Sequence, residues 1–201
     1  MNNSKGPSWL NRLFAVCCRL ILCFGLYGCA TDARQASALQ VEQLTSQETV
    51  AGERVWSAPE LQVRRFRIQF YGYDTVDYRL TAMQVDPTHG AVAYRLSIDA
   101  NYGSNSPRGY QSAKTPDGVL TPLSQLRHEA LRCQLFGNMS SACLYRDRAA
   151  LELNAAALQA ARRDGMALTL GASDKDYERI DLPADYVDGF LRAVERPPIN
   201  Q

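Results

Sequence analysis

The chain has 201 residues, of which 46% are hydrophobic, and its 22 Lys and Arg residues nearly balance its 21 Asp and Glu residues. This length predicts one domain with enough chain to bury a core. Such a neutral balance gives no electrostatic footprint for nucleic acid or for an anionic membrane surface, so we expect no nucleic-acid partner.

The N-terminus combines positive charge with a short apolar segment. Basic residues, but no acidic ones, occur before Asp32, and the apolar run 20–26 ends in Leu26-Tyr27-Gly28-Cys29. Arg19 interrupts the longer apolar stretch, so neither side approaches the roughly 20 residues of a membrane-spanning helix. The pattern favours a signal peptide over a retained transmembrane helix.

The Leu26-Tyr27-Gly28-Cys29 segment resembles the lipobox of bacterial lipoproteins. The resemblance implies a signal peptide over residues 1–28 and acylation of Cys29, with a diacylglycerol on its thiol and a further chain such as palmitate on its amine. Several acyl chains anchor a protein more firmly than one myristoyl group. Because Ala30 and Thr31 follow the cysteine, where an Asp would mean inner-membrane retention, the resemblance implies an outer-membrane lipoprotein facing the periplasm. An uncleaved apolar segment with an incidental cysteine is the alternative, and it leaves the charge asymmetry unexplained.

Residues 29–52 predict a flexible, at most transiently helical tether behind the acylated cysteine. Ala, Gln, Ser and Thr dominate this segment, and it contains no aromatic residue. Trp56 is the first aromatic residue after the leader. We therefore expect a single α+β periplasmic domain over residues 53–196 and a tail over residues 197–201.

Period-two alternation of apolar and polar side chains predicts strands in the first half of this domain. Residues 61–71, 76–85 and 91–102 alternate in this way, and turn residues separate them. Three consecutive strands joined by short turns form an antiparallel meander. Residues 102–118 are rich in Gly, Pro, Asn and Ser, which predicts a long exposed loop.

Two further strands, residues 126–136 and 142–153, carry Cys133 and Cys143 on either side of a turn-rich segment. After loss of the leader and acylation of Cys29, these are the two cysteines left to pair, and an oxidising periplasm favours a disulfide. A loop this small contributes about 2.5 to 3 kcal/mol in the loop-entropy model. Two buried thiols are the alternative. A metal pair is disfavoured because no Cys or His lies at finger-like spacing.

Two helices are predicted near the C-terminus. Asn154 is a favourable N-cap for a helix over 155–163, and Pro183 precedes an amphipathic helix over 184–195, with strands 166–171 and 177–182 between them. Many strands and two late helices predict an α+β fold with a mostly antiparallel sheet. The stretch from Asn154 to Val194 resembles the C-terminal half of uncharacterised proteobacterial envelope proteins, a likeness that implies no particular chemistry.

Catalytic and metal-binding patterns are scarce. His89 lies in a turn and His128 in a strand-like segment, and no Gly-x-Ser-x-Gly motif occurs, so we interpret both histidines as solvated. The densest acidic cluster lacks the glycine and terminal glutamate of an EF-hand and predicts a solvated hairpin turn rather than a calcium site; it comprises Asp174, Asp176, Glu178 and Asp181. We therefore assign no catalytic residue, no metal and no cofactor.

Tyr102 and Tyr110 bracket the predicted loop, which also contains Arg108. Tyrosine offers a large amphipathic contact area at low entropic cost, and Gly, Ser and Asn make a loop adaptable. We therefore interpret Tyr102, Arg108 and Tyr110 as candidate binding residues. The alternative is that these tyrosines are ordinary sheet and loop aromatics.

Two classes of function remain open. The first is a membrane-anchored envelope lipoprotein with a non-catalytic binding or assembly domain for a protein or a cell-wall glycan such as peptidoglycan. The second is a periplasmic envelope hydrolase whose site is assembled from dispersed Asp, Glu and Tyr residues. An exposed aromatic patch on a sheet or loop would favour the first class, and a cleft lined by close carboxylates with shifted pKa values would favour the second. The first is our interpretation of the sequence.

Overall fold

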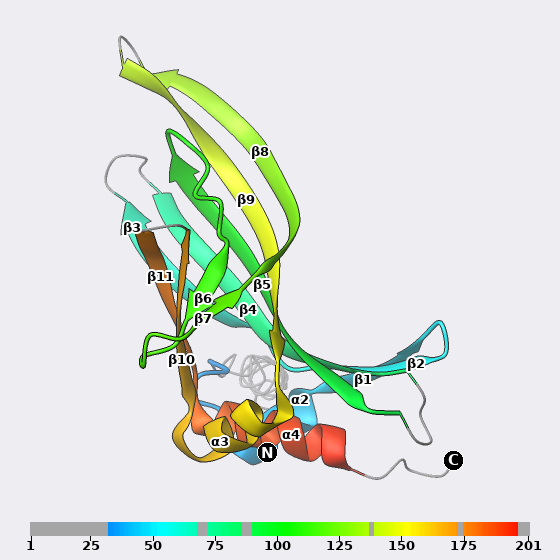
Figure 1. Cartoon of the computed structure of the whole chain (residues 1–201). Helices are drawn as coiled ribbons and strands as arrows, with labels where there is room; N and C mark the ends of the chain where they lie inside the picture. Colours follow the sequence, from blue (N-terminus) through cyan, green and yellow to red (C-terminus); the bar gives the residue numbers. More distant parts are fainter. Residues whose placement is uncertain (1–31, 68–71, 86–89, 137–138, 173–174, 197–201) are drawn as a thin grey trace, which may run out of the picture. The chain divides into compact units, whose positions relative to one another are not determined.

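The computed structural model describes residues 32–67, 72–85, 90–136, 139–172 and 175–196, which form two antiparallel sheets and three helices (Figure 1). The α+β class with a mostly antiparallel sheet and two C-terminal helices is confirmed. The leader with Cys29, the turn with His89, and Asp174 lie outside the described residues. No helix in the described part of the chain has both the length and the apolar character needed to cross a membrane.

The larger sheet has the strand order β1-β2-β4-β5-β9-β8. Strand β4 is long enough to pair with β3 along its first part and with β2 along its last part. The strands of this sheet are β1 (Ser46–Val50), β2 (Glu53–Ser57), β3 (Leu61–Arg67), β4 (Gly72–Gln84), β5 (Val92–Ser104), β8 (Ser124–Phe136) and β9 (Met139–Leu153). The expected meander corresponds to β3, β4 and β5, and the expected hairpin to β8 and β9.

The two faces of this sheet differ as the alternation predicts. Tyr78, Ile98 and Leu151 lie on one face, here called the inner face, and are buried. Asp77 and Asp99 lie on the other face, here called the outer face, in register with a basic side chain of β9. Because successive residues of a strand point to opposite faces, one strand contributes to both the core and a charged surface.

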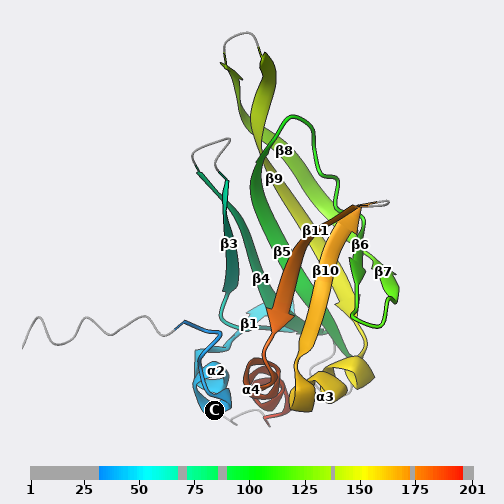
Figure 2. The same ribbon diagram turned by 90° about the vertical axis from the view of Figure 1, so that its left-hand side faces the viewer.

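A smaller sheet covers the inner face of the larger one (Figure 2). Its order is β11-β10-β6-β7, with β6 (Ser112–Lys114), β7 (Leu120–Pro122), β10 (Met166–Ala172) and β11 (Lys175–Leu182). The Tyr78 hydroxyl joins the two sheets by donating to the Asp181 carbonyl at 2.9 Å. Strand β6 lies within residues 102–118, which were expected to form a loop, and β5 extends into this range as far as Ser104. That expectation is therefore wrong for residues 103–104 and 112–114.

Three helices pack together at one end of the strands, with α4 (Ala184–Glu195) between α2 (Ala38–Leu44) and α3 (Ala155–Asp164) (Figure 2). The Tyr186 hydroxyl of α4 donates to the Pro59 carbonyl at 2.8 Å and accepts from the Leu80 N–H, which fastens the helix layer to the larger sheet. A Cβ at Gly189 would lie 2.2 Å from the Ala38 carbonyl oxygen, so glycine is what allows α2 and α4 to approach this closely.

The structure differs from the expected flexible tether over residues 32–52. Residues 38–44 form α2, and residues 46–50 form β1. A capping box between Ser37 and Gln40 starts the helix, and Val41 is fully buried. Burial of this apolar residue stabilises a helix that would be marginal in isolation.

Candidate functional site

Tyr102, Arg108 and Tyr110 are interior residues, and the exposed recognition loop expected there is wrong. Their exposed fractions are 0%, 6% and 3%. Tyr102 lies on the inner face of β5, and Arg108 and Tyr110 belong to the segment that crosses to the smaller sheet. Together they form part of a polar cluster between the sheets.

Arg108 is the centre of this cluster. Its guanidinium donates to Glu178 of β11 at 3.1 Å, to the Tyr110 hydroxyl at 3.0 Å, and to Asp74 of β4. All of these side chains are buried. The guanidinium also lies over the Tyr102 ring, 4.4 Å from its centroid. One arginine therefore bonds to residues of both sheets.

A second set of contacts runs from Tyr102 toward the surface. Its hydroxyl donates to Asp147 at 2.6 Å and accepts from the Arg108 backbone N–H at 2.9 Å. The other oxygen of Asp147 is bonded to Nδ1 of His128, whose side chain is 34% exposed. A carboxylate only accepts hydrogen bonds, so the imidazole carries a proton on Nδ1. His128 is exposed, as expected, and the contact with Asp147 in addition fixes its orientation at the edge of the cluster.

Burial controls the protonation of these groups. It raises the pKa of Tyr110 to about 12, and burial together with the hydrogen bond to Asp147 raises the pKa of Tyr102 well above its usual value. Burial alone would lower the pKa of Arg108, but Tyr110 and Asp74 outweigh this effect and raise it. At neutral pH the cluster therefore holds neutral phenols around a permanently charged guanidinium.

The acidic cluster expected at the β10–β11 turn is divided between surface and core. Glu178 is buried against Arg108, so the expectation that it is solvated is wrong. Asp176 pairs with Lys114 at 2.5 Å, and Asp181 pairs with Arg179 at 3.1 Å. No group of three or more His, Cys, Asp or Glu side chains within the described residues is placed to hold a metal ion.

The hairpin of β8 and β9 presents the exposed surface that the tyrosines do not. Cys133 and Cys143 are opposite each other across the hairpin and form a disulfide, as predicted. Strand β8 is a sheet edge, and among its residues 124–133 all but Glu129 are exposed. The register shifts at several points along β8, and two of the bulged residues are Leu126 and Leu131.

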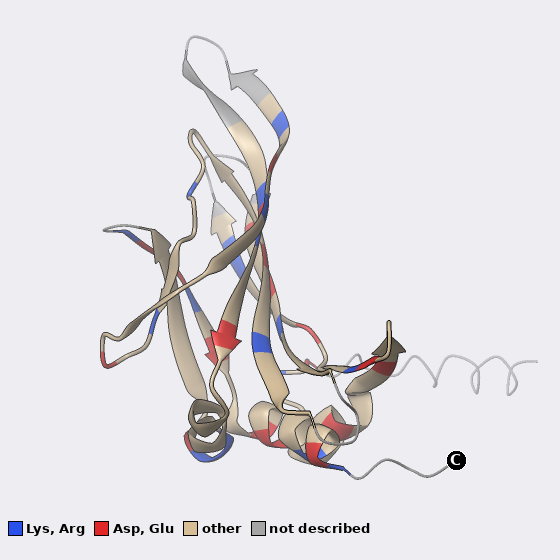
Figure 3. Ribbon diagram, turned by 45° about the vertical axis from the view of Figure 1, so that its right-hand side comes forward, with Lys and Arg blue, Asp and Glu red and all other residues tan. Residues whose placement is uncertain are grey.

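Three exposed leucines lie on this hairpin: Leu126 at 59%, Leu131 at 50% and Leu144 at 42%. Arg127 and Arg132 are their neighbours on β8, and basic positions recur along both strands (Figure 3). We call these five residues the β8 surface. A bulge interrupts the hydrogen-bond ladder and redirects a side chain, so the bulges both blunt the open edge and present leucines to solvent.

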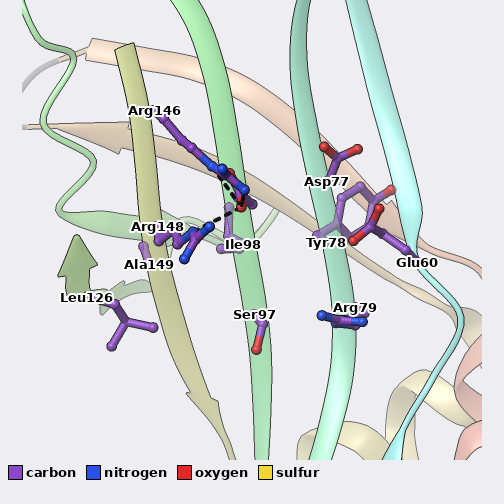
Figure 4. A pocket seen from close by; sticks show the side chains of 11 residues that line it. Glu60, Asp77, Tyr78, Arg79, Ser97, Ile98, Leu126, Arg146, Arg148 and Ala149 are labelled. Atoms are coloured by element: carbon purple, nitrogen blue, oxygen red, sulfur yellow. Dashed lines mark hydrogen bonds and ion pairs between the residues drawn. The ribbon is translucent and has the colours of Figure 1, made fainter. Parts of the chain in front are cut away.

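A hollow of about 390 Å³ opens on the outer face beside this hairpin, between β4, β5 and β9 (Figure 4). Arg146 and Arg148 of β9 both contact Asp99, at 2.5 and 3.2 Å. Partial burial raises the pKa of Asp99, but hydrogen bonds and charge from the two arginines outweigh it and lower the pKa. Asp99 is therefore ionised at neutral pH and is shared by two cations.

No family model matches the chain, and neither the curated proteins nor the solved structures contain a match to it. The site is therefore interpreted from its own geometry.

The sequence carries a signal for the inward position of two residues of the cluster. Tyr102 continues the alternation of Leu96 and Ile98, which places it on the same inner face. Asp147 likewise alternates with Tyr145 and Ala149, but a charged residue in an apolar series is usually assigned to the surface. Its burial depends on partners far away in the chain.

Proposed function

We propose that the protein is a lipoprotein of the bacterial outer membrane, anchored through Cys29, whose domain binds an envelope protein without catalysing a reaction. The observation that supports binding is the β8 surface: three exposed leucines on a disulfide-linked hairpin at the edge of the larger sheet. Leu131 and Leu144 lie next to each other across the hairpin, and neighbouring exposed apolar residues are typical of interaction sites.

The charges of the β8 surface indicate what kind of partner it fits. Arg127 pairs with Glu129, whereas Arg146 and Arg148 share the single carboxylate of Asp99, which leaves an excess positive charge on the outer side of the hairpin. Complementary charge around an apolar centre raises the association rate and selects among partners. We therefore propose a protein partner with an apolar contact surface and an acidic rim. Bulges in β8 favour side-chain contacts over the addition of a partner strand.

The disulfide is consistent with the proposed compartment. Disulfides persist in oxidising environments such as the periplasm and are rare in the bacterial cytoplasm. The Cys133–Cys143 bond holds the two strands together where the hairpin extends past β5, since β9 pairs with β5 only from Cys143 onward. It would keep the leucines in a fixed arrangement when a partner binds.

The anchor is tested by replacing its cysteine. Cys29→Ser is expected to abolish acylation, so the protein should move from the membrane fraction to the soluble periplasm or accumulate as an unprocessed precursor. Fractionation with intact-mass measurement detects either result, and Cys23→Ser in the same segment is the matched control. The proposal would be contradicted if the Cys29→Ser protein stayed in the membrane fraction and its mass differed from that of the unsubstituted protein only by the exchange of sulfur for oxygen.

The binding surface is tested by photo-crosslinking in intact envelopes. With a photoreactive residue in place of Leu131, we expect one discrete protein adduct, reduced at least about tenfold when Leu126→Ser and Leu144→Ser are introduced, because buried anchors commonly contribute more than 1 kcal/mol each. Leu120, which is 63% exposed on β7, is the control position and should give no such adduct.

Three results would contradict this assignment. The same adduct from position 120 would show that capture is unspecific, and an adduct insensitive to the serine substitutions would place the contact elsewhere. An adduct that a muramidase converts to small glycan fragments would assign the surface to cell-wall glycan.

The hydrolase alternative has one specific observation in its favour. His128 is oriented by a buried carboxylate through Nδ1, which is how general-base histidines are commonly held. Hydrolysis of an envelope component that is lost in His128→Gln, with the fold intact, would favour this alternative over the binding role.

A further inference from the structure

The hollow on the outer face has two walls of opposite charge. On one side, Arg146 and Arg148 share the single carboxylate of Asp99, so this wall keeps one excess positive charge. On the other side, Glu60 and Asp77 lie with Arg79, so this wall keeps one excess negative charge. Figure 4 shows the two groups on opposite sides of Ser97.

Within the described part of the chain, the two acidic side chains of the negative wall form no ion pair, although the pKa of Arg146, raised chiefly by its hydrogen bond to Asp99, is raised further by the charge of Asp77 across the hollow. Asp77 accepts a hydrogen bond from the neutral Gln62 side chain at 2.5 Å. Arg148 reaches Asp99 through Nε alone, which leaves its two terminal nitrogens for another acceptor. The hollow therefore offers carboxylates that can accept hydrogen bonds from a cation on one side and a guanidinium that can donate hydrogen bonds to an anion on the other.

We propose that this hollow binds a short peptide as a zwitterion, with the N-terminal ammonium at Glu60 and Asp77 and the C-terminal carboxylate at Arg148. The hollow adjoins the β8 surface, since Leu126 lines it, but the proposal does not require a protein partner at that surface. A ligand with one charge of each sign matches both walls, whereas a purely anionic or purely cationic ligand would meet repulsion at one of them.

The size of the hollow fits a peptide of about three residues. Strands β4 and β9 are separated by β5, so they lie about 10 Å apart at the usual strand spacing. An extended residue spans about 3.3 to 3.6 Å, so a tripeptide covers this distance between its two charged ends. The volume of about 390 Å³ is also within the range of small-ligand sites. The Ser97 hydroxyl lies between the walls, where it can bond to the peptide backbone.

The test uses trialanine, its N-acetylated form and its C-terminal amide, titrated into the folded protein and followed by NMR. We expect trialanine to bind about fivefold more tightly than either capped form, because one partly exposed ion pair is worth up to about 1 kcal/mol. Arg148→Met should weaken trialanine and N-acetyl-trialanine and leave the amide unchanged. Asp77→Asn should weaken trialanine and the amide and leave the N-acetylated form unchanged.

Arg95→Met is the matched control, because Arg95 lies on the same outer face but pairs with Glu152 outside the hollow. Each variant is first checked for an unchanged melting temperature. Equal binding of all three peptides, or equal weakening by the control, would overturn the proposal, and so would the absence of trialanine binding at millimolar concentration.

Discussion

Arg108→Met is expected to lower the free energy of unfolding by about 3 to 5 kcal/mol. The substitution removes the cation that Asp74 and Glu178 share and leaves these carboxylates buried without it. Methionine keeps most of the side-chain volume, so the loss reports on charge and hydrogen bonding more than on a cavity. Urea unfolding at pH 7 measures the effect as a lower midpoint with an unchanged slope.

Arg95→Met provides the comparison for Arg108→Met. Arg95 pairs with Glu152 at 2.7 Å, but both side chains are about half exposed. An exposed pair of this kind contributes at most about 1 kcal/mol. If the two variants lose similar, small amounts of stability, Arg108 is not the buried link between the sheets that the structure shows.

The parts of the fold that depend on local sequence could be predicted. Asn154 caps α3 by accepting from the Ala156 and Ala157 N–H groups, as its position before an alanine-rich segment indicated. The strand pairs of the meander followed from period-two alternation, and the disulfide followed from two cysteines on either side of a turn. Each of these signals lies within a short stretch of chain.

The interior position of Arg108 could not be predicted in this way. Its partners Asp74 and Glu178 are 34 and 70 positions away, and Gly- and Pro-rich sequence around it is typical of exposed loops. A charged residue is rarely buried unless partners are present, and no local pattern shows whether they are. The β8 surface was also missed. Residues 126–136 were predicted only as a strand of a hairpin, and the sequence of one strand does not show that it forms an uncovered edge of the larger sheet.

The buried phenols predict that the protein loses stability at alkaline pH. Tyr102, Tyr110 and Tyr186 each have a raised pKa in the folded protein, chiefly because of burial, and that of Tyr110 is raised to about 12. An unfolded tyrosine loses its proton near pH 10. Above pH 10 the unfolded chain therefore binds fewer protons than the folded protein, and the free energy of unfolding falls as pH rises. Stability from these groups is complete below pH 10 and is lost as pH approaches their folded pKa values.

The slope should approach about 1.4 kcal/mol per pH unit for each of these tyrosines, or about 4 kcal/mol for the three together. Urea unfolding between pH 9 and 12 measures it, with tyrosinate absorbance recorded on the folded protein in parallel. Tyr110→Phe should reduce the slope by up to about 1.4 kcal/mol per pH unit, because it removes one of the protons involved, whereas Tyr73→Phe, at a position 62% exposed, should leave it unchanged. Tyrosinate absorbance that rises near pH 10 for all tyrosines before any unfolding would show that these phenols are accessible to water and that the polar cluster between the sheets is open.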